Sequence, residues 1–327
     1  MLERIRSINN FLSARMFYIT IFALSLGYLL PFSSPNPYAK TVNITLFALV
    51  TFFASISLSL QDFLRILKNP RIPLWLLFVV HVCGPVVIYL LSMLFYPNDA
   101  QTRMGMLIAA ILPMGVSTIV WISVMGGNIG VSVVAITLDT LLAPFIVAIF
   151  LKLFFQQNID INYTAMLVEM MCMVTIPSVL GMIAHNYLAK NPSIYTKITV
   201  IGALFSKFCM AAVIYISVAM VFPNIVFDQS IVKLVLVIMV LVLSSFVLGY
   251  LASLPVKNLD RGLFISIIYN VGMRNINFGI VLAVGYFPPA VAIPVTLMTL
   301  FQQPTAALVC YCINKIFSFR QKEELPN

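Results

Sequence analysis

Long apolar runs alternate with short polar connections along almost the whole chain. Many of these runs are close to the ~20 residues that an α-helix needs to cross a bilayer. The runs cover residues 17–31, 42–60, 73–95, 104–125, 129–155, 164–189, 198–221, 231–254, 263–287 and 290–316. The connections between them carry turn-forming residues, as in Gly126-Gly127-Asn128. This pattern predicts an all-α integral membrane protein with one transmembrane helix for each run.

The predicted helices divide into two sets of five with similar lengths, which is the arrangement of an inverted repeat. The fourth and ninth helices then occupy corresponding positions, and both are interrupted. Pro113-Met114-Gly115 breaks the fourth, and Gly272 with its amide neighbours breaks the ninth. Irregular backbone at membrane depth survives only where protein buries it or it lines an aqueous cavity. Paired interruptions of this kind indicate the substrate or ion site of a transporter.

Composition and charge agree with a protein that lies almost entirely in the bilayer. Hydrophobic residues make up 61% of the chain and charged residues 9%, and the mean hydropathy is +1.05. The net charge of +9 is dispersed among loops, so it favours positive-inside loops over a nucleic-acid surface. Only four basic loop residues fall on the less basic side, namely Lys40, Arg103, Lys152 and Lys233. Both termini are therefore expected in the cytoplasm, with the protein in the cell (inner) membrane.

Arg274 is the most informative charge, because a permanent cation inside a membrane segment costs several kcal/mol unless it is compensated. Asp139 in the fifth predicted helix has a similar depth, and it lies seven residues from Ser132 on nearly the same helix face. Three interpretations of Arg274 stay open. It forms a static pair with Asp139, it contacts an anionic substrate directly, or the pair is switched by protonation.

Three further ionisable residues lie inside predicted helices. His81 is either a satisfied core histidine or a proton-coupling group, since the charge of histidine changes near neutral pH. Glu169 and Lys207 either pair with each other or face a substrate cavity. The cysteines lie in apolar segments without metal-ligand spacing and are expected to pack as small hydrophobes.

Several short motifs, taken in order, carry a resemblance to a known family. They are Pro113-x-Gly115, Gly127-Asn128-x-x-x-Ser132, Pro177-x-Val179-Leu180-Gly181-x-Ile183-x-His185 and Val271-Gly272-Met273-x-Asn275. In this order and spacing the chain resembles the bile acid:sodium symporter family over most of its length.

The resemblance implies a fold with two parts and a site between them. A core of helices 3–5 and 8–10 would cover residues 69–157 and 229–327, and a panel of helices 1, 2, 6 and 7 would cover 1–68 and 158–228. The broken fourth and ninth helices would cross in the core. The positions expected to contact substrate are Thr118, Asn128, Asn270, Arg274, Asn275 and His81.

The departures from the family concern sodium. Family members that bind two sodium ions have a carboxylate and a glutamine where this chain has Asn270 and Arg274, and a glutamine at or next to His81. Residual ligand positions are Thr118, Ser132 and the carbonyls of Val271 and Met273. A guanidinium about 5 Å away costs a monovalent cation roughly 3 kcal/mol at an effective dielectric near 20, or about a hundredfold in affinity. We therefore do not expect two-sodium coupling.

The expected function is secondary transport of a small organic solute, an organic anion, as a uniporter or with protons. The alternative is a sodium symporter of bile-acid-like or other carboxylates with one reorganised sodium site. A channel or receptor would lack the crossing. The chain has no nucleotide-binding loop and no H-E-x-x-H or G-x-S-x-G motif, so we expect neither an ATP-driven pump nor an enzyme. No resident cofactor or nucleic-acid partner is expected, and the oligomeric state stays open.

Overall fold

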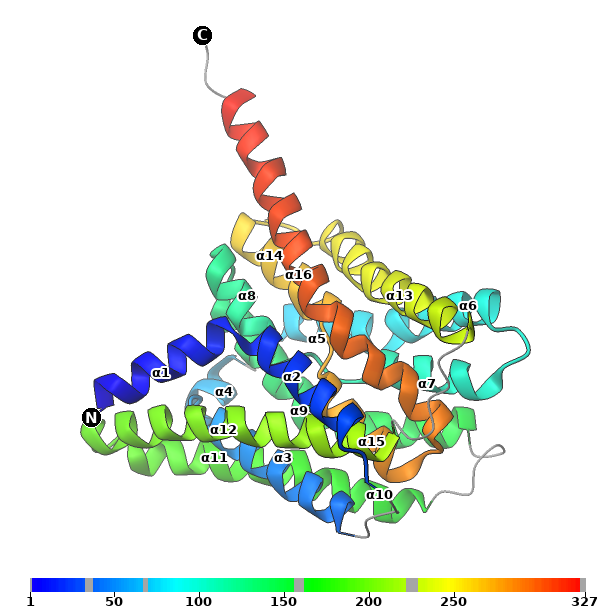
Figure 1. The fold of residues 1–327 in the computed structure, drawn as a ribbon. Helices are drawn as coiled ribbons and strands as arrows, with labels where there is room; N and C mark the ends of the chain where they lie inside the picture. The colour runs from blue at the N-terminus through cyan, green and yellow to red at the C-terminus, as the bar shows by residue number, and fades with distance from the viewer. Residues whose placement is uncertain (1, 33–37, 67–69, 156–161, 222–228, 324–327) are drawn as a thin grey trace.

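The computed structural model describes residues 2–32, 38–66, 70–155, 162–221 and 229–323 (Figure 1). These residues form α-helices and two short π-helical turns, η1 and η2; within them the only β pairing is one isolated bridge. The elements are α1 Leu2–Ala14, α2 Met16–Leu29, α3 Ala39–Ser55, α4 Leu60–Ile66, α5 Arg71–Phe78, η1 Val79–Cys83, α6 Gly84–Phe95, α7 Ala100–Ile111, α8 Thr118–Met125, α9 Ile129–Phe155, α10 Tyr163–Met170, η2 Met171–Thr175, α11 Ile176–Leu188, α12 Pro192–Val221, α13 Gln229–Ser253, α14 Arg261–Gly272, α15 Ile276–Tyr286 and α16 Pro289–Glu323.

The apolar segments of the sequence correspond to these helices. Among the described residues, 6 helices are long and apolar enough to cross a membrane, and α2, α3 and α15 contain shorter apolar stretches. The fourth predicted segment is divided between α7 and α8, and the ninth between α14 and α15. Both predicted interruptions are therefore confirmed.

Local chemistry explains why the two helices break. α7 ends before Pro113, and a residue that precedes proline is driven out of the helical region. Leu112 accordingly has φ −59° and ψ 145°. α14 ends at Gly272, and Met273 is extended with φ −116° and ψ 128°. α15 then restarts with Asn275 as its cap, whose side chain accepts a hydrogen bond from Phe278 N.

The two breaks meet in an antiparallel bridge between Met114 and Arg274. Gly115 N donates to Met273 O at 3.0 Å, and Asn275 N donates to Pro113 O at 2.7 Å. We call residues 112–117 and 273–275 the crossing. These two bonds satisfy part of the backbone of the crossing, which favours its placement inside an apolar protein.

The remaining helices surround the crossing in two groups. α12 packs against α2, α3 and α1, and α3 also packs against α11. In the other group α13 packs against α14 and α16, α7 against α6 and α16, and α5 against α9. Figure 1 shows α3, α11 and α12 together on one side, with α6 and α13 on the opposite side. The two groups are also in contact, since α12 and α3 pack against α15.

Gly115 provides a test of the crossing, because a Cβ at this position would lie 2.8 Å from Arg274 O. Arg274 O is a backbone atom of the facing strand, so it cannot move without separating the two strands. Gly115→Ala should cost about 1–3 kcal/mol, as overpacking of a filled interior does. The measurement is thermal unfolding of the detergent-purified protein. Gly130→Ala is the matched control, since a Cβ at Gly130 would meet only Asn128 Oδ1 at 3.5 Å. Equal stability of the two variants would show that the crossing tolerates separation.

Candidate functional site

Arg274 lies in the crossing with a side chain almost removed from solvent, at 3% exposure. Its Nη1 donates to Val271 O at 2.7 Å, and its Nε donates to Ala110 O at 3.2 Å. Val271 belongs to the last turn of α14 and Ala110 to the last turn of α7. C-terminal turns carry partial negative charge and unsatisfied carbonyls, so both stabilise a cation. The guanidinium thus joins the carboxyl ends of both interrupted helices.

Gln302 of α16 holds the backbone of the same residue. Arg274 N donates to Gln302 Oε1 at 2.8 Å, and Gln302 Nε2 donates to Arg274 O at 3.0 Å. The amide side chain therefore pairs with Arg274 as the backbone of a neighbouring strand would. The next residue, Gln303, accepts from Trp121 Nε1 at 2.9 Å and contacts Ser117 Oγ at 3.5 Å. Two adjacent glutamines thereby connect α16 to both breaks.

Asp139 is fully buried and binds the other strand of the crossing. Its Oδ2 accepts from Met114 N at 2.7 Å, and its Oδ1 lies 2.5 Å from His81 Nε2. Direct pairing of Asp139 with Arg274 is not found: within the described residues His81 is the ion-pair partner of Asp139. The static-pair interpretation was therefore wrong about contact: Met114 N and His81 bind the two carboxylate oxygens, and the Arg274 nitrogens bind backbone carbonyls instead. Asp139 and Arg274 act on opposite strands of one crossing.

His81 reaches Asp139 from the π-helical turn η1. π-helical turns insert an extra residue into a helix and are frequent at functional sites. Pro85 follows this turn at the start of α6 and lacks the N–H that a regular helix would use. His81 Nδ1 is buried and has no hydrogen-bond partner among the described residues. One ring nitrogen therefore contacts the carboxylate, and the other is buried without a partner in the part of the chain that the structure describes.

A second polar group surrounds Asn270 in the last turn of α14. Its Nδ2 donates to Ser132 Oγ at 2.9 Å and to Ser266 O at 2.8 Å. Asn270 Oδ1 and Thr118 Oγ1 are buried without a hydrogen-bond partner in the described part of the chain. These oxygens leave unused acceptor capacity beside the crossing.

The carbonyls predicted as residual sodium ligands are already bonded. Val271 O accepts from the Arg274 guanidinium, and Met273 O accepts from Gly115 N at 3.0 Å. The donors present at these two carbonyls are thus a fixed cation and a backbone amide. Each carbonyl oxygen keeps a second lone pair, and of the other two predicted ligand positions, Ser132 Oγ also accepts one hydrogen bond, from Asn270 Nδ2.

Two of the expected substrate-contacting residues instead cap helices. Asn128 is exposed in the turn before α9, where its Oδ1 accepts from Val131 N at 3.1 Å. Asn275 caps α15 and joins the crossing through its backbone. The structure brings Thr118, Asn270, Arg274 and Asn275 to the crossing, with His81 reaching it through Asp139. Asn128 stays apart from it.

Glu169 and Lys207 do not pair with each other. Lys207 Nζ donates to Asn9 Oδ1 of α1, whereas Glu169 pairs with Lys40 of α3 and accepts from Tyr286 OH of α15. The sequence did not predict Lys40 and Tyr286 as partners of Glu169. It also did not predict that the two glutamines of α16 contact the breaks. The only available signal for the glutamines was an adjacent amide pair inside the apolar run 290–316.

A polytopic helical protein with two broken helices that meet around a buried charge has the architecture of a secondary transporter. Comparison with known proteins agrees. Residues 14–318 match the SBF-like CPA transporter family (DUF4137), which is of the bile acid:sodium symporter type, and the chain belongs to that family. It is therefore a transporter-family membrane protein.

Three relatives show how the resemblance is distributed. The chain is 31% identical to "Uncharacterized protein YbaS" of Bacillus subtilis (strain 168), over 83% of this chain and 88% of that protein. It is 23% identical to "Uncharacterized sodium-dependent transporter YocS" of the same organism, over 94% of this chain and 93% of that protein. It is 24% identical to "Probable sodium/metabolite cotransporter BASS2, chloroplastic" of Oryza sativa subsp. japonica, over 73% of this chain and 56% of that protein.

Gln302 gives the second prediction. Gln302→Leu should leave Arg274 N unpaired in a buried place, at about 1–3 kcal/mol; Arg274 O keeps its bond from Ile276 N at 2.9 Å and loses only its second donor. Gln302→Glu should keep the acceptor for Arg274 N, so its stability should fall between that of the unmodified protein and that of Gln302→Leu. Gln303→Leu is the matched control, because its partly exposed contacts can be replaced by water. Thermal unfolding of the purified variants measures the difference, and equal losses for both glutamines would contradict the assigned role.

Proposed function

We propose that the protein transports a small organic anion by alternating access, without two-sodium coupling. The observation that carries the proposal is the Arg274 guanidinium on the carbonyls of Val271 and Ala110. In the sodium-binding relatives implied by the resemblance, a mobile cation would lie between the broken helices. Here a covalently attached cation neutralises the same helix ends and cannot be released during a transport cycle.

The proposed moving bodies are the core and the panel, arranged as ten transmembrane helices in two inverted repeats with both termini in the cytoplasm. The crossing belongs entirely to the core, where its hydrogen bonds hold α7, α8, α14 and α15 together. A solute bound beside the crossing would therefore move with the core as a unit. The positive charge of Arg274 and the unused groups of His81 and Thr118 favour an anion with further hydrogen-bonding groups.

The coupling mode is proposed as uniport or proton coupling. The His81–Asp139 pair supports the second, because a buried imidazole and carboxylate that share one contact can exchange a proton, and Met114 N links the carboxylate to the crossing. An imposed proton gradient distinguishes the two modes: it should drive accumulation of the anion only if transport is proton coupled.

The third prediction concerns sodium. In proteoliposomes with purified protein, uptake from a panel of radiolabelled organic acids should be almost unchanged when choline or potassium replaces sodium. Empty liposomes are the control for leakage. A steep, saturable dependence on sodium would overturn the proposal and favour the alternative below.

The fourth prediction replaces the fixed cation at Arg274 and returns a carboxylate to position 270. Asn270→Glu/Arg274→Gln restores the carboxylate and the glutamine that the resemblance places at these positions, and removes the fixed cation. This double variant should acquire stabilisation by sodium over choline, seen as a higher unfolding temperature, whereas the unmodified protein should show no difference. Asn270→Glu alone is the control, since its new carboxylate should pair with Arg274. Sodium stabilisation of the unmodified protein would contradict the role given to Arg274.

A second candidate is a sodium-coupled symporter with one reorganised site. Two observations favour it: two relatives carry sodium in their names, and Thr118 and Asn270 keep unpartnered oxygens next to Ser132. The sodium replacement experiment decides between the two candidates.

A further inference from the structure

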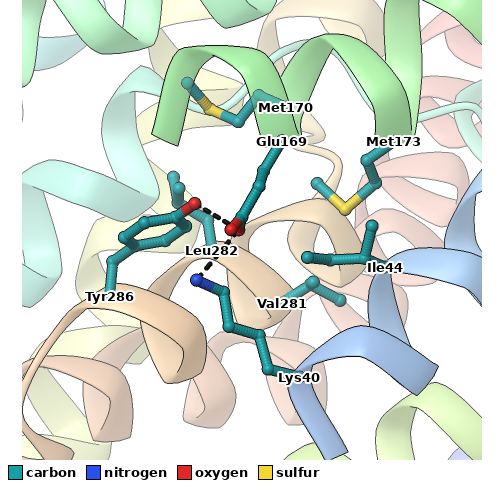
Figure 2. Close-up of a pocket in the computed structure, with 8 residues that line it drawn as sticks. All are labelled: Lys40, Ile44, Glu169, Met170, Met173, Val281, Leu282 and Tyr286. Atoms are coloured by element: carbon teal, nitrogen blue, oxygen red, sulfur yellow. Dashed lines mark hydrogen bonds and ion pairs between the residues drawn. The ribbon is translucent and has the colours of Figure 1, made fainter. Parts of the chain in front are cut away.

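A second charged cluster lies where α15 of the core meets α3 and α10 of the panel. Lys40 Nζ is 2.9 Å from Glu169 Oε2, and Tyr286 OH donates to the same oxygen. Lys40 Nζ also lies over the Tyr286 ring, 3.8 Å from its centroid. We call these three residues the rim cluster. Figure 2 shows all three side chains converging from separate helices, with the Glu169 carboxylate between the other two.

The rim cluster lies beside a pocket whose other walls are apolar. Ile44 and Met173 line it from the panel side, and Val281 and Leu282 line it from α15 (Figure 2). The Lys40 and Glu169 side chains are 32% and 37% exposed, so solvent reaches them. The pocket therefore combines one cation, one carboxylate and one phenol with a hydrocarbon wall at a place that solvent reaches.

A static structural role explains this cluster poorly. An ion pair that solvent reaches contributes only about 0–1 kcal/mol to stability. Ionisable residues within membrane segments instead mark substrate and ion pathways. Glu169 belongs to the panel and Tyr286 to the core, so their hydrogen bond must break whenever the two bodies separate at this end.

The donors around Glu169 are those that any carboxylate would use. An ammonium group supplies charge and a phenol O–H supplies a directed hydrogen bond, which together bind a carboxylate oxygen well. We propose that Lys40 and Tyr286 form a binding site for the anionic group of the transported solute, which Glu169 occupies in this structure as an internal substitute. The apolar wall of the pocket would contact the hydrocarbon part of the same solute. This inference rests on the proposed transport of an organic anion.

The site has two consequences for the transport cycle. While Glu169 fills it, the carboxylate holds core and panel together at the rim. When Glu169 turns toward solvent, Lys40 and Tyr286 become available and the apolar wall is uncovered. An anion that takes these donors thus favours the open arrangement, which is a population shift driven by differential binding.

The fifth prediction uses charged probes, so the natural solute need not be known. Val281→Cys places a thiol in the pocket wall, at a position that is 4% exposed. Its reaction rate with an anionic reagent (2-sulfonatoethyl methanethiosulfonate) is compared with that of a cationic one (2-trimethylammonioethyl methanethiosulfonate). The full-length protein in nanodiscs is used, so that both faces are accessible. Peptide mass spectrometry follows the introduced thiol alone, and the native cysteines stay in place.

In this background Glu169→Gln should raise the anionic-to-cationic rate ratio by about tenfold, because it leaves Lys40 unpaired. Lys40→Met should lower the ratio, and Lys40→Arg should preserve it. Tyr286→Phe should raise both rates without changing the ratio, since it loosens the contact between core and panel without changing charge. Lys40→Met/Glu169→Gln should restore the original ratio at a higher overall rate, and it also tests the site if Glu169→Gln fails to fold.

Two controls separate the site from general effects. Lys207→Met removes a different panel lysine and should leave the reactivity of the introduced pocket thiol unaffected. Ala100→Cys, an exposed reporter at the start of α7, should show a constant ratio in every variant. Equal changes for both reagents, or an unchanged ratio in Glu169→Gln, would overturn the anion site. An anionic preference of the pocket thiol without any anion uptake in proteoliposomes would retain the site and reject the proposed function.

Discussion

The structure depends on one permanently charged side chain placed where two helices have been opened. Broken helices present unpaired carbonyls at membrane depth, and an isolated guanidinium in the same place lacks solvation. Arg274 resolves both problems at once, because its nitrogens bind Ala110 O and Val271 O at the ends of α7 and α14. Neither the breaks nor the cation would be stable alone. The short antiparallel bridge between them follows from this mutual dependence.

Polar side chains from three further helical elements also bind the crossing or its ligands. Gln302 of α16 pairs with the backbone of Arg274, and Asp139 of α9 accepts from Met114 N on the opposite strand. His81 of η1 then contacts the carboxylate. Each of these side chains comes from a different helix, so the crossing also fixes the core helices relative to one another. A rigid body of this kind is what an alternating-access mechanism requires.

Much of this fold could be predicted from the sequence, because proline, glycine and a buried charge each leave a local signal. The two breaks followed from Pro113 and from Gly272 with its amide neighbours. The partner of Asp139 did not, because equal depth says nothing about direction around a helix axis. The π-helical turn at Val79–Cys83 adds to this uncertainty, since one extra residue rotates everything after it. Gln302 and Gln303 were missed for a related reason: an amide in an apolar run does not show which helix it will face.

The charged groups around Arg274 and around Glu169 differ in their partners and in their exposure to solvent. Arg274 is held mainly by backbone groups of α7 and α14 and is 3% exposed. Glu169 is held by two side chains from different helices, Lys40 of α3 and Tyr286 of α15, and is 37% exposed. Contacts between backbone and a buried cation persist only while the local fold persists, whereas contacts between solvated side chains can form and break without unfolding. Under the proposed alternating-access mechanism, the contacts of the crossing would therefore stay intact and those of the rim cluster would open.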